Sequence, residues 1–138
     1  MKTPNWAQDL ILDTILYLQS KGFQCDLPDI KWYNAPKTRW DLKQDKPAKR
    51  EGSSGLCYRE YISIREGTDR RDCKLVLLHE LAHWALPLNS NDHEGHTDKF
   101  WGVAFDLYRE FGLSLRVCLK RERSYRKGSI KAYRKLKG

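Results

Sequence analysis

The stretches "HELAHW" (residues 79–84) and "HEGHTDKFW" (residues 93–101) contain all four histidines of this 138-residue chain. In a helix, side chains four residues apart lie on the same face, so His79 and His83 can direct their imidazoles at one point. This spacing predicts two ligands for one metal ion. The carboxylate of Glu80, next to the first histidine, can then reach a water on the metal and act as a general base.

Zinc is the metal that this chemistry favours. Neutral imidazoles are good Zn²⁺ ligands, and three protein ligands leave a fourth position for a water whose pKa falls to about 7. The alternative is an incidental match of the pattern on an amphipathic helix. A second cluster of histidines follows at a workable distance, so we expect Zn²⁺ as the cofactor.

The third ligand is predicted from the residues that follow. One variant of the pattern, that of the metzincins, has glycine and histidine where this chain has Leu86 and Asn89, so that variant is excluded. We favour His96, which directly precedes a predicted helix and can be held rigidly there. We expect His93 to be a solvent-exposed loop residue. The candidates that remain open are His93, Glu94, His96 and Asp106.

The order of predicted elements indicates an α+β fold. Thr3 and Pro4 resemble a helix cap, and Ala7, Ile11, Ile15 and Leu18 then recur on one face until Gly22. Three strands are expected at 29–36, at 37–43 and within "LCYREYISIREG" (56–67). A helix over 73–86 should bury Leu75, Leu78, Ala82 and Ala85. A third helix, capped by Thr97 and Asp98 and ended by Gly112, should bury Phe100, Trp101, Ala104, Phe105, Tyr108 and Phe111.

The basic residues are concentrated at the end of the chain. Residues 115–138 contain ten Lys or Arg and one acid, Glu122, which leaves sixteen basic and seventeen acidic side chains before them. We therefore divide the chain into a folded domain, 1–114, and a basic C-terminal tail, 115–138. One domain is what a chain of this length usually forms.

The tail repeats Tyr-Arg-Lys at 125–127 and 133–135. Lys and Arg can bind phosphates with release of counterions, and a tyrosine ring can stack on an exposed base. This interleaving predicts binding of DNA or RNA. The alternatives are a solvated, helical extension or a tail that docks on the acidic surface of its own domain.

Composition restricts the remaining classes of protein. With 40% hydrophobic residues, the chain resembles a globular protein, and no run approaches the roughly 18 apolar residues of a membrane span. The four cysteines form no CxxC pair, which argues against a cysteine zinc ribbon and favours free thiols. We expect a cytoplasmic protein without a membrane anchor.

"LVLLHELAHW" (75–84) followed by "HTDKF" (96–100) resembles the SprT-like zinc metallopeptidases, which are zincins of the gluzincin type. The similarity covers residues 1–113 in the order of elements and 75–101 in motif. It implies a zincin-like domain with His79, His83 and His96 as ligands and Glu80 as catalytic base. It also implies that the strand around "YISI" is the edge along which a substrate lies, and that substrates include DNA-associated proteins. The family's usual glycine after the third histidine is Thr97 here, and its frequent cysteine zinc module is missing.

Two functions are consistent with these patterns. The first is a hydrolase, a zinc-dependent peptidase in which Glu80 acts as the base. The second is a catalytically silent zincin-fold module that recognises nucleic acid or a protein partner. An intact HExxH motif favours the enzyme, because a binding module has no need of Glu80.

Overall fold

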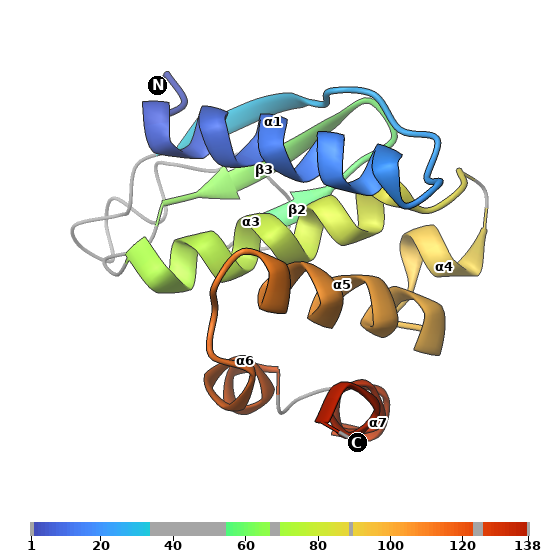
Figure 1. Cartoon of the computed structure of the whole chain (residues 1–138). Helices are drawn as coiled ribbons and strands as arrows, with labels where there is room; N and C mark the ends of the chain where they lie inside the picture. Colours follow the sequence, from blue (N-terminus) through green and yellow to red (C-terminus); the bar gives the residue numbers. More distant parts are fainter. Residues whose placement is uncertain (1, 34–54, 67–69, 89, 123–125, 138) are drawn as a thin grey trace, which may run out of the picture.

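The computed structural model describes residues 2–33, 55–66, 70–88, 90–122 and 126–137, whose elements are arranged as in Figure 1. They form six helices and a three-stranded sheet, which confirms the predicted α+β class. The strands are β1 (Asp29–Tyr33), β2 (Gly55–Cys57) and β3 (Tyr61–Arg65). The helices are α1 (Asn5–Ser20), α3 (Arg70–Ala85), α4 (Asn91–Glu94), α5 (Asp98–Glu110), α6 (Leu115–Arg121) and α7 (Arg126–Lys137).

The sheet is mixed and has the strand order β1–β3–β2. β1 runs parallel to β3 and pairs Ile30 with Ile62, while β2 runs antiparallel to β3 and pairs Leu56 with Ser63. The "YISI" strand, β3, therefore lies between the other two. Our expectation that it forms an edge is wrong, and β1 and β2 are the outer strands of the described sheet.

The strand predictions are only partly correct. The strand expected at 29–36 is present as Asp29–Tyr33, and the one expected at 37–43 lies outside the described residues. The stretch 56–67, expected as one strand, contributes to two, because the chain reverses at Arg59 and Glu60. The amide of Tyr58 donates to the carbonyl of Tyr61 at 2.9 Å and closes this turn.

The predicted faces of the first and third long helices are buried. Ala7, Ile11, Ile15 and Leu18 of α1 all lie in the core, and Gly22, at φ 94°, lies directly after its end. Pro4 itself is the N-cap of α1 and its carbonyl accepts the first helical hydrogen bonds, so the predicted cap by Thr3 is wrong. The face predicted for the third helix is buried throughout α5, while Phe111, the C-cap residue, is half-buried.

Helix α3 is the central element of the structure. It packs against α1, β2 and β3 and, on another side, against α5 (Figure 1). Leu75, Leu78, Ala82 and Ala85 are buried as predicted, and so are Leu77 and Leu81. A helix that is apolar on most of its faces is surrounded by protein, so a polar side chain on it enters a water-poor environment. None of the described helices combines the length and the apolar character needed to cross a membrane.

The C-terminal residues form two helices that pack on the rest of the chain. Ser114 caps α6 by accepting from the amide of Val117, and both α6 and α7 lie against α5. Cys118, Glu122 and Ser129 are buried in this arrangement. The domain boundary after residue 114 stays a prediction, but the segment that follows is folded against the segment that precedes it.

Two helical glycines offer a matched test of this packing. A Cβ atom at Gly128 of α7 would collide with the Trp101 ring and lie 2.6 Å from its Nε1, whereas one at Gly102 of α5 meets nothing within 4 Å. Gly102→Ala should raise the free energy of unfolding by up to about 1 kcal/mol through helix propensity. Gly128→Ala should lower it by about 1–3 kcal/mol because of overpacking.

Urea unfolding monitored by circular dichroism measures both changes. Shifts of the same sign in the two variants would contradict the close packing of α7 on Trp101.

Candidate metal centre

His79 and His83 project from one face of α3, one helical turn apart. The two ring centroids lie 5.2 Å from each other. His83 is 6% exposed and its ring stacks on Phe100 of α5 at 4.0 Å. Since α5 packs directly on α3, this face of the helix contacts aromatic side chains instead of solvent.

His96 reaches the same place from the connection between α4 and α5. Thr97 fixes this connection, because its hydroxyl donates to Asp92 at 2.5 Å and accepts from the amide of Phe100 at 3.2 Å. Thr97 is therefore the N-cap of α5, as predicted. Thr97 thus holds α4, α5 and the adjacent His96 in register.

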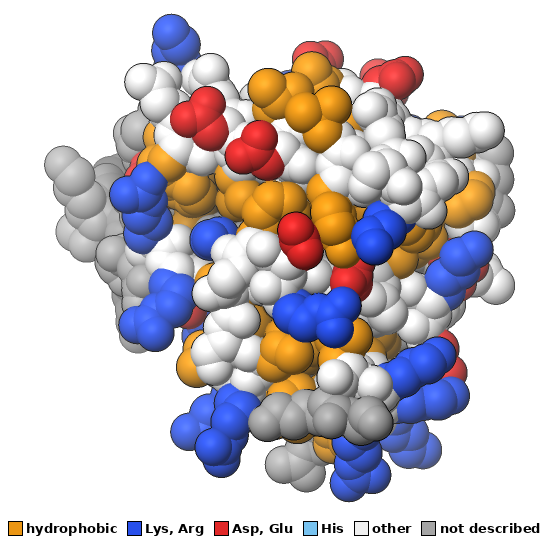
Figure 2. Space-filling model, viewed as in Figure 1, with side chains coloured by type: hydrophobic (Ala, Val, Ile, Leu, Met, Phe, Trp, Pro, Cys, Tyr) orange, Lys and Arg blue, Asp and Glu red, His pale blue; other side chains and the backbone are white. Residues whose placement is uncertain are grey.

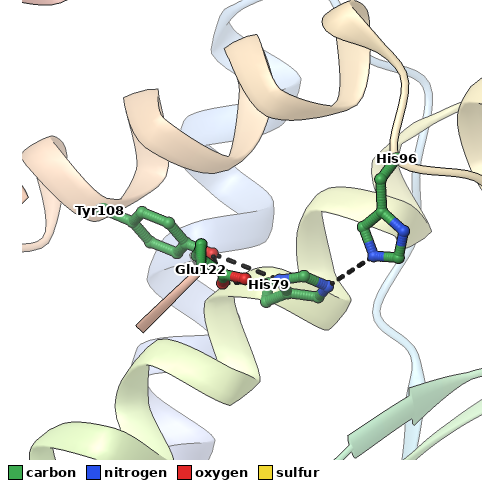
Figure 3. A network of polar contacts seen from close by, with 4 residues as sticks. All are labelled: His79, His96, Tyr108 and Glu122. Atoms are coloured by element: carbon green, nitrogen blue, oxygen red, sulfur yellow. Dashed lines mark hydrogen bonds and ion pairs between the residues drawn. The ribbon is translucent and has the colours of Figure 1, made fainter. Parts of the chain in front are cut away.

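The three imidazoles converge. Ligand nitrogens of His79, His83 and His96 all lie within 4.8 Å of one another, so the group could hold a metal ion. The Nε2 atoms of His79 and His96 are 3.2 Å apart (Figure 3). Two nitrogens bound to one tetrahedral Zn²⁺ at about 2.0–2.1 Å are about 3.3 Å apart, so the spacing fits a shared ion.

Hydrogen bonds on the other ring nitrogens orient two of the ligands. His79 Nδ1 lies 2.9 Å from Oε1 of Glu122, and His83 Nδ1 lies 2.8 Å from the carbonyl oxygen of His93. Carboxylate and carbonyl oxygens only accept, so Nδ1 carries the proton in each ring. In a neutral imidazole this leaves the Nε2 lone pair free for a metal, which is the usual arrangement around a metal-binding histidine.

The protonation of the rings also suits metal binding. Burial, with the nearby charges of His79 and His96, lowers the pKa of His83 to about 3, and burial with His79 lowers the pKa of His96 to about 4. Burial also acts to lower the pKa of His79, but the hydrogen bond to Glu122 and the charges of Glu80 and Glu122 raise it overall. Two of the three ligands are therefore neutral at pH 7, and a metal competes with a proton mainly at His79.

Glu80 adjoins the first ligand but does not belong to the converging group. It is 7% exposed, and burial, followed by the charge of Glu122, raises the pKa of its carboxyl to about 7 although His79 acts in the opposite direction. The backbone of β2 passes close to this carboxylate: a Cβ atom at Gly55 would lie 3.2 Å from Oε2 of Glu80. Glycine at this position leaves room for the carboxylate beneath the strand.

The other candidates for the third ligand lie outside the group. His93 is 5% exposed and within α4, with Nδ1 at 3.1 Å from the carbonyl oxygen of Leu86, so our expectation of an exposed loop residue is wrong. It is buried because Ser90 caps a short helix that turns the ring inward. Glu94 is exposed, and Asp106 accepts a hydrogen bond from Tyr17 at 2.8 Å. All four cysteines are free, as expected, and none joins the group.

Glu122 and Tyr108 complete the surroundings of His79, and sequence patterns did not identify either as part of the site. The Tyr108 hydroxyl donates to Oε1 of Glu122 at 3.0 Å, the same oxygen that contacts His79 (Figure 3). Tyr108 was expected only as an apolar-face residue. The available signal for Glu122 was that it is the one acid among ten basic residues.

No family model, curated protein or solved structure matches this chain.

The ligand set predicts which substitutions remove the metal. Purified wild-type chain should contain about one zinc ion, and His79→Ala, His83→Ala and His96→Ala should each lose most of it on dialysis, because three ligands are the usual minimum of an open zinc site. His93→Gln should keep it, since residue 93 bonds to His83 through its backbone carbonyl, which the substitution leaves in place. Elemental analysis measures the content. Zinc retained in His96→Ala but lost in His93→Gln would overturn the third ligand.

Proposed function

We propose that this chain is a zinc-dependent peptidase of the SprT-like type, built on a zincin-like domain. The observation that carries the proposal is the convergence of His79, His83 and His96 beside a buried carboxylate that stays outside the ligand set. An acid whose pKa lies near 7 can both take up and release a proton at neutral pH, as a general base must. A site that served only to bind metal would not require this group.

The chemistry divides between the metal and Glu80. A bound Zn²⁺ would polarise the peptide carbonyl and make a water acidic enough to lose a proton at neutral pH. Glu80 accepts that proton on a carboxylate oxygen as the water oxygen bonds to the carbonyl carbon. The same proton then passes from Glu80 to the leaving nitrogen as the carbon–nitrogen bond breaks, which restores the carboxylate.

The position of β2 supports a place for the substrate. β2 is an outer strand of the described sheet, and its Gly55 passes next to the Glu80 carboxylate. An extended peptide that pairs with a strand here would have its backbone amides fixed relative to Glu80. We therefore assign substrate alignment to β2 instead of to the central "YISI" strand.

Glu80→Gln tests the role of the base. Glutamine keeps the size of the side chain, so zinc content and melting temperature should stay close to those of the wild type. Cleavage of a loosely folded, fluorophore-labelled protein should fall by about two to four orders of magnitude, the usual contribution of a positioned base.

Cleavage by wild-type chain loaded with one zinc ion is required by the proposal. If neither the wild type nor Glu80→Gln cleaves any such substrate, the peptidase fails and the catalytically silent binding module takes its place.

A second candidate function is binding of nucleic acid by the C-terminal helices. Figure 2 shows Lys and Arg side chains gathered at the lower end of the molecule, over α6 and α7. Between these helices lies a cavity of about 690 Å³, lined by Arg116, Lys120 and Tyr133 together with apolar side chains. Cations beside an aromatic ring are suited to phosphates and a stacked base. Two other cations of the C-terminal helices form ion pairs instead: Arg121 pairs with Asp72, and Lys131 pairs with Asp98.

Charge-removing substitutions on α7 test this function better than truncation, which would also remove Glu122. The affinity of the variant for a single-stranded oligonucleotide should fall. A plot of the logarithm of the binding constant against the logarithm of the salt concentration should become less steep by about 0.7 for each phosphate that the variant no longer binds. The variant replaces with glutamine the exposed residues Lys127, Arg134 and Lys135. A control with the same reduction in charge replaces Lys2, Lys21 and Arg59. Equal effects in the two variants would exclude a site on α7.

A further inference from the structure

The C-terminal helices reach the metal centre at two separate points. The first is Glu122, at the C-cap of α6, which is 5% exposed. Its Oε1 atom lies 2.9 Å from Nδ1 of His79 and accepts from Tyr108 at 3.0 Å (Figure 3). A buried carboxylate is costly unless donors satisfy it, so these two contacts both hold α6 in place and fix the His79 ring.

The second point is the packing of α7 on Trp101. Gly128 brings the α7 backbone so close to this ring that a Cβ atom would not fit. Trp101 in turn stacks on His96, with ring centroids 5.5 Å apart and planes inclined by 28°. α7 therefore packs on Trp101, and Trp101 in turn supports the third ligand, His96.

The other polar contacts of the segment are weak by comparison. Arg121 pairs with Asp72 at 3.3 Å and Lys131 pairs with Asp98 at 2.7 Å, but at least one partner of each pair is more than half exposed to solvent. Exposed pairs of this kind contribute little to stability. Among the ion pairs described for this segment, the buried one is that of Glu122 with His79, a metal ligand.

We infer that Glu122 is a positioning residue for His79, and that docking of α6 and α7 is thermodynamically linked to metal binding. The inference rests on the proposed metal site. The docked segment holds His79 with Nε2 directed toward His96, where an ion would bind, and supports His96 through Trp101, so metal binds more tightly when the segment is docked. By reciprocity, bound metal stabilises the docked segment by the same factor. Helices α6 and α7, with Glu122, thus belong to the metal centre.

The zinc affinity of full-length variants, measured by competition with a chromogenic chelator, tests the role of Glu122. Glu122→Ala should bind zinc about 10- to 100-fold more weakly than the wild type, as is usual when an outer partner of a ligand is removed. Glu122→Gln should fall between the two, because its amide oxygen still accepts from Nδ1 without the charge. Arg121→Ala, which removes the exposed pair of the same helix, is the control and should match the wild type.

Hydrogen exchange of the wild-type chain tests the linkage without any substitution. Zinc should slow exchange of the α6 and α7 amides as well as those around the ligands. If zinc does not change the exchange rates of the α6 and α7 amides, the linkage is wrong even if the site binds metal.

The outcomes separate this inference from the metal site on which it rests. If His79→Ala abolishes zinc binding but Glu122→Ala changes the zinc affinity by less than twofold, the metal site is supported and the role of Glu122 is wrong. An equal decrease in Arg121→Ala and Glu122→Ala would assign the effect to helix docking in general and overturn the specific role of Glu122. A wild-type chain that binds no zinc would overturn both the site and the inference.

Discussion

The imidazole of His79 must satisfy a different requirement at each of its two nitrogens. Nδ1 needs an acceptor in a buried place, and Nε2 has to remain available for a metal. The structure meets the first requirement with Glu122, which lies 43 positions further along the chain, and the second by placing His96 opposite. Helix α3 packs against the sheet, α1, α4 and α5, and its two histidines contact α4, α5 and the end of α6. The site therefore depends on how α5, α6 and α7 pack.

Two buried carboxylates flank His79 and have different surroundings. Glu122 is a neighbour of His79 Nδ1 and of the Tyr108 hydroxyl, which together hold it in one orientation. Glu80 lies under β2, where burial raises the pKa of its carboxyl to about 7. Different environments commonly give two acids of one site different tasks. Here one acid would orient a ligand and the other would transfer protons.

Local sequence rules predicted the parts of the site that depend on one helix or one cap. The spacing of His79 and His83 follows from helix geometry, and His96 was favoured because a capped helix follows it. The exposed position expected for His93 was wrong, since burial of a short helix depends on packing against α3. The "YISI" strand was placed at an edge by resemblance to a known family, and the reversal at Arg59 and Glu60 that lets β2 pair beside it was not predicted. Glu122 could not be predicted from spacing, because its role arises only when α6 folds back on α3 and α5.

X-ray absorption at the zinc edge of the metal-loaded full-length chain is the direct test of the three-histidine site. We expect three imidazole nitrogens at about 2.0–2.1 Å from the zinc and no sulfur ligand. A sulfur neighbour at about 2.3 Å would contradict it, since the four free cysteines lie outside the group of histidines. Fewer than three imidazoles around the zinc would also contradict it.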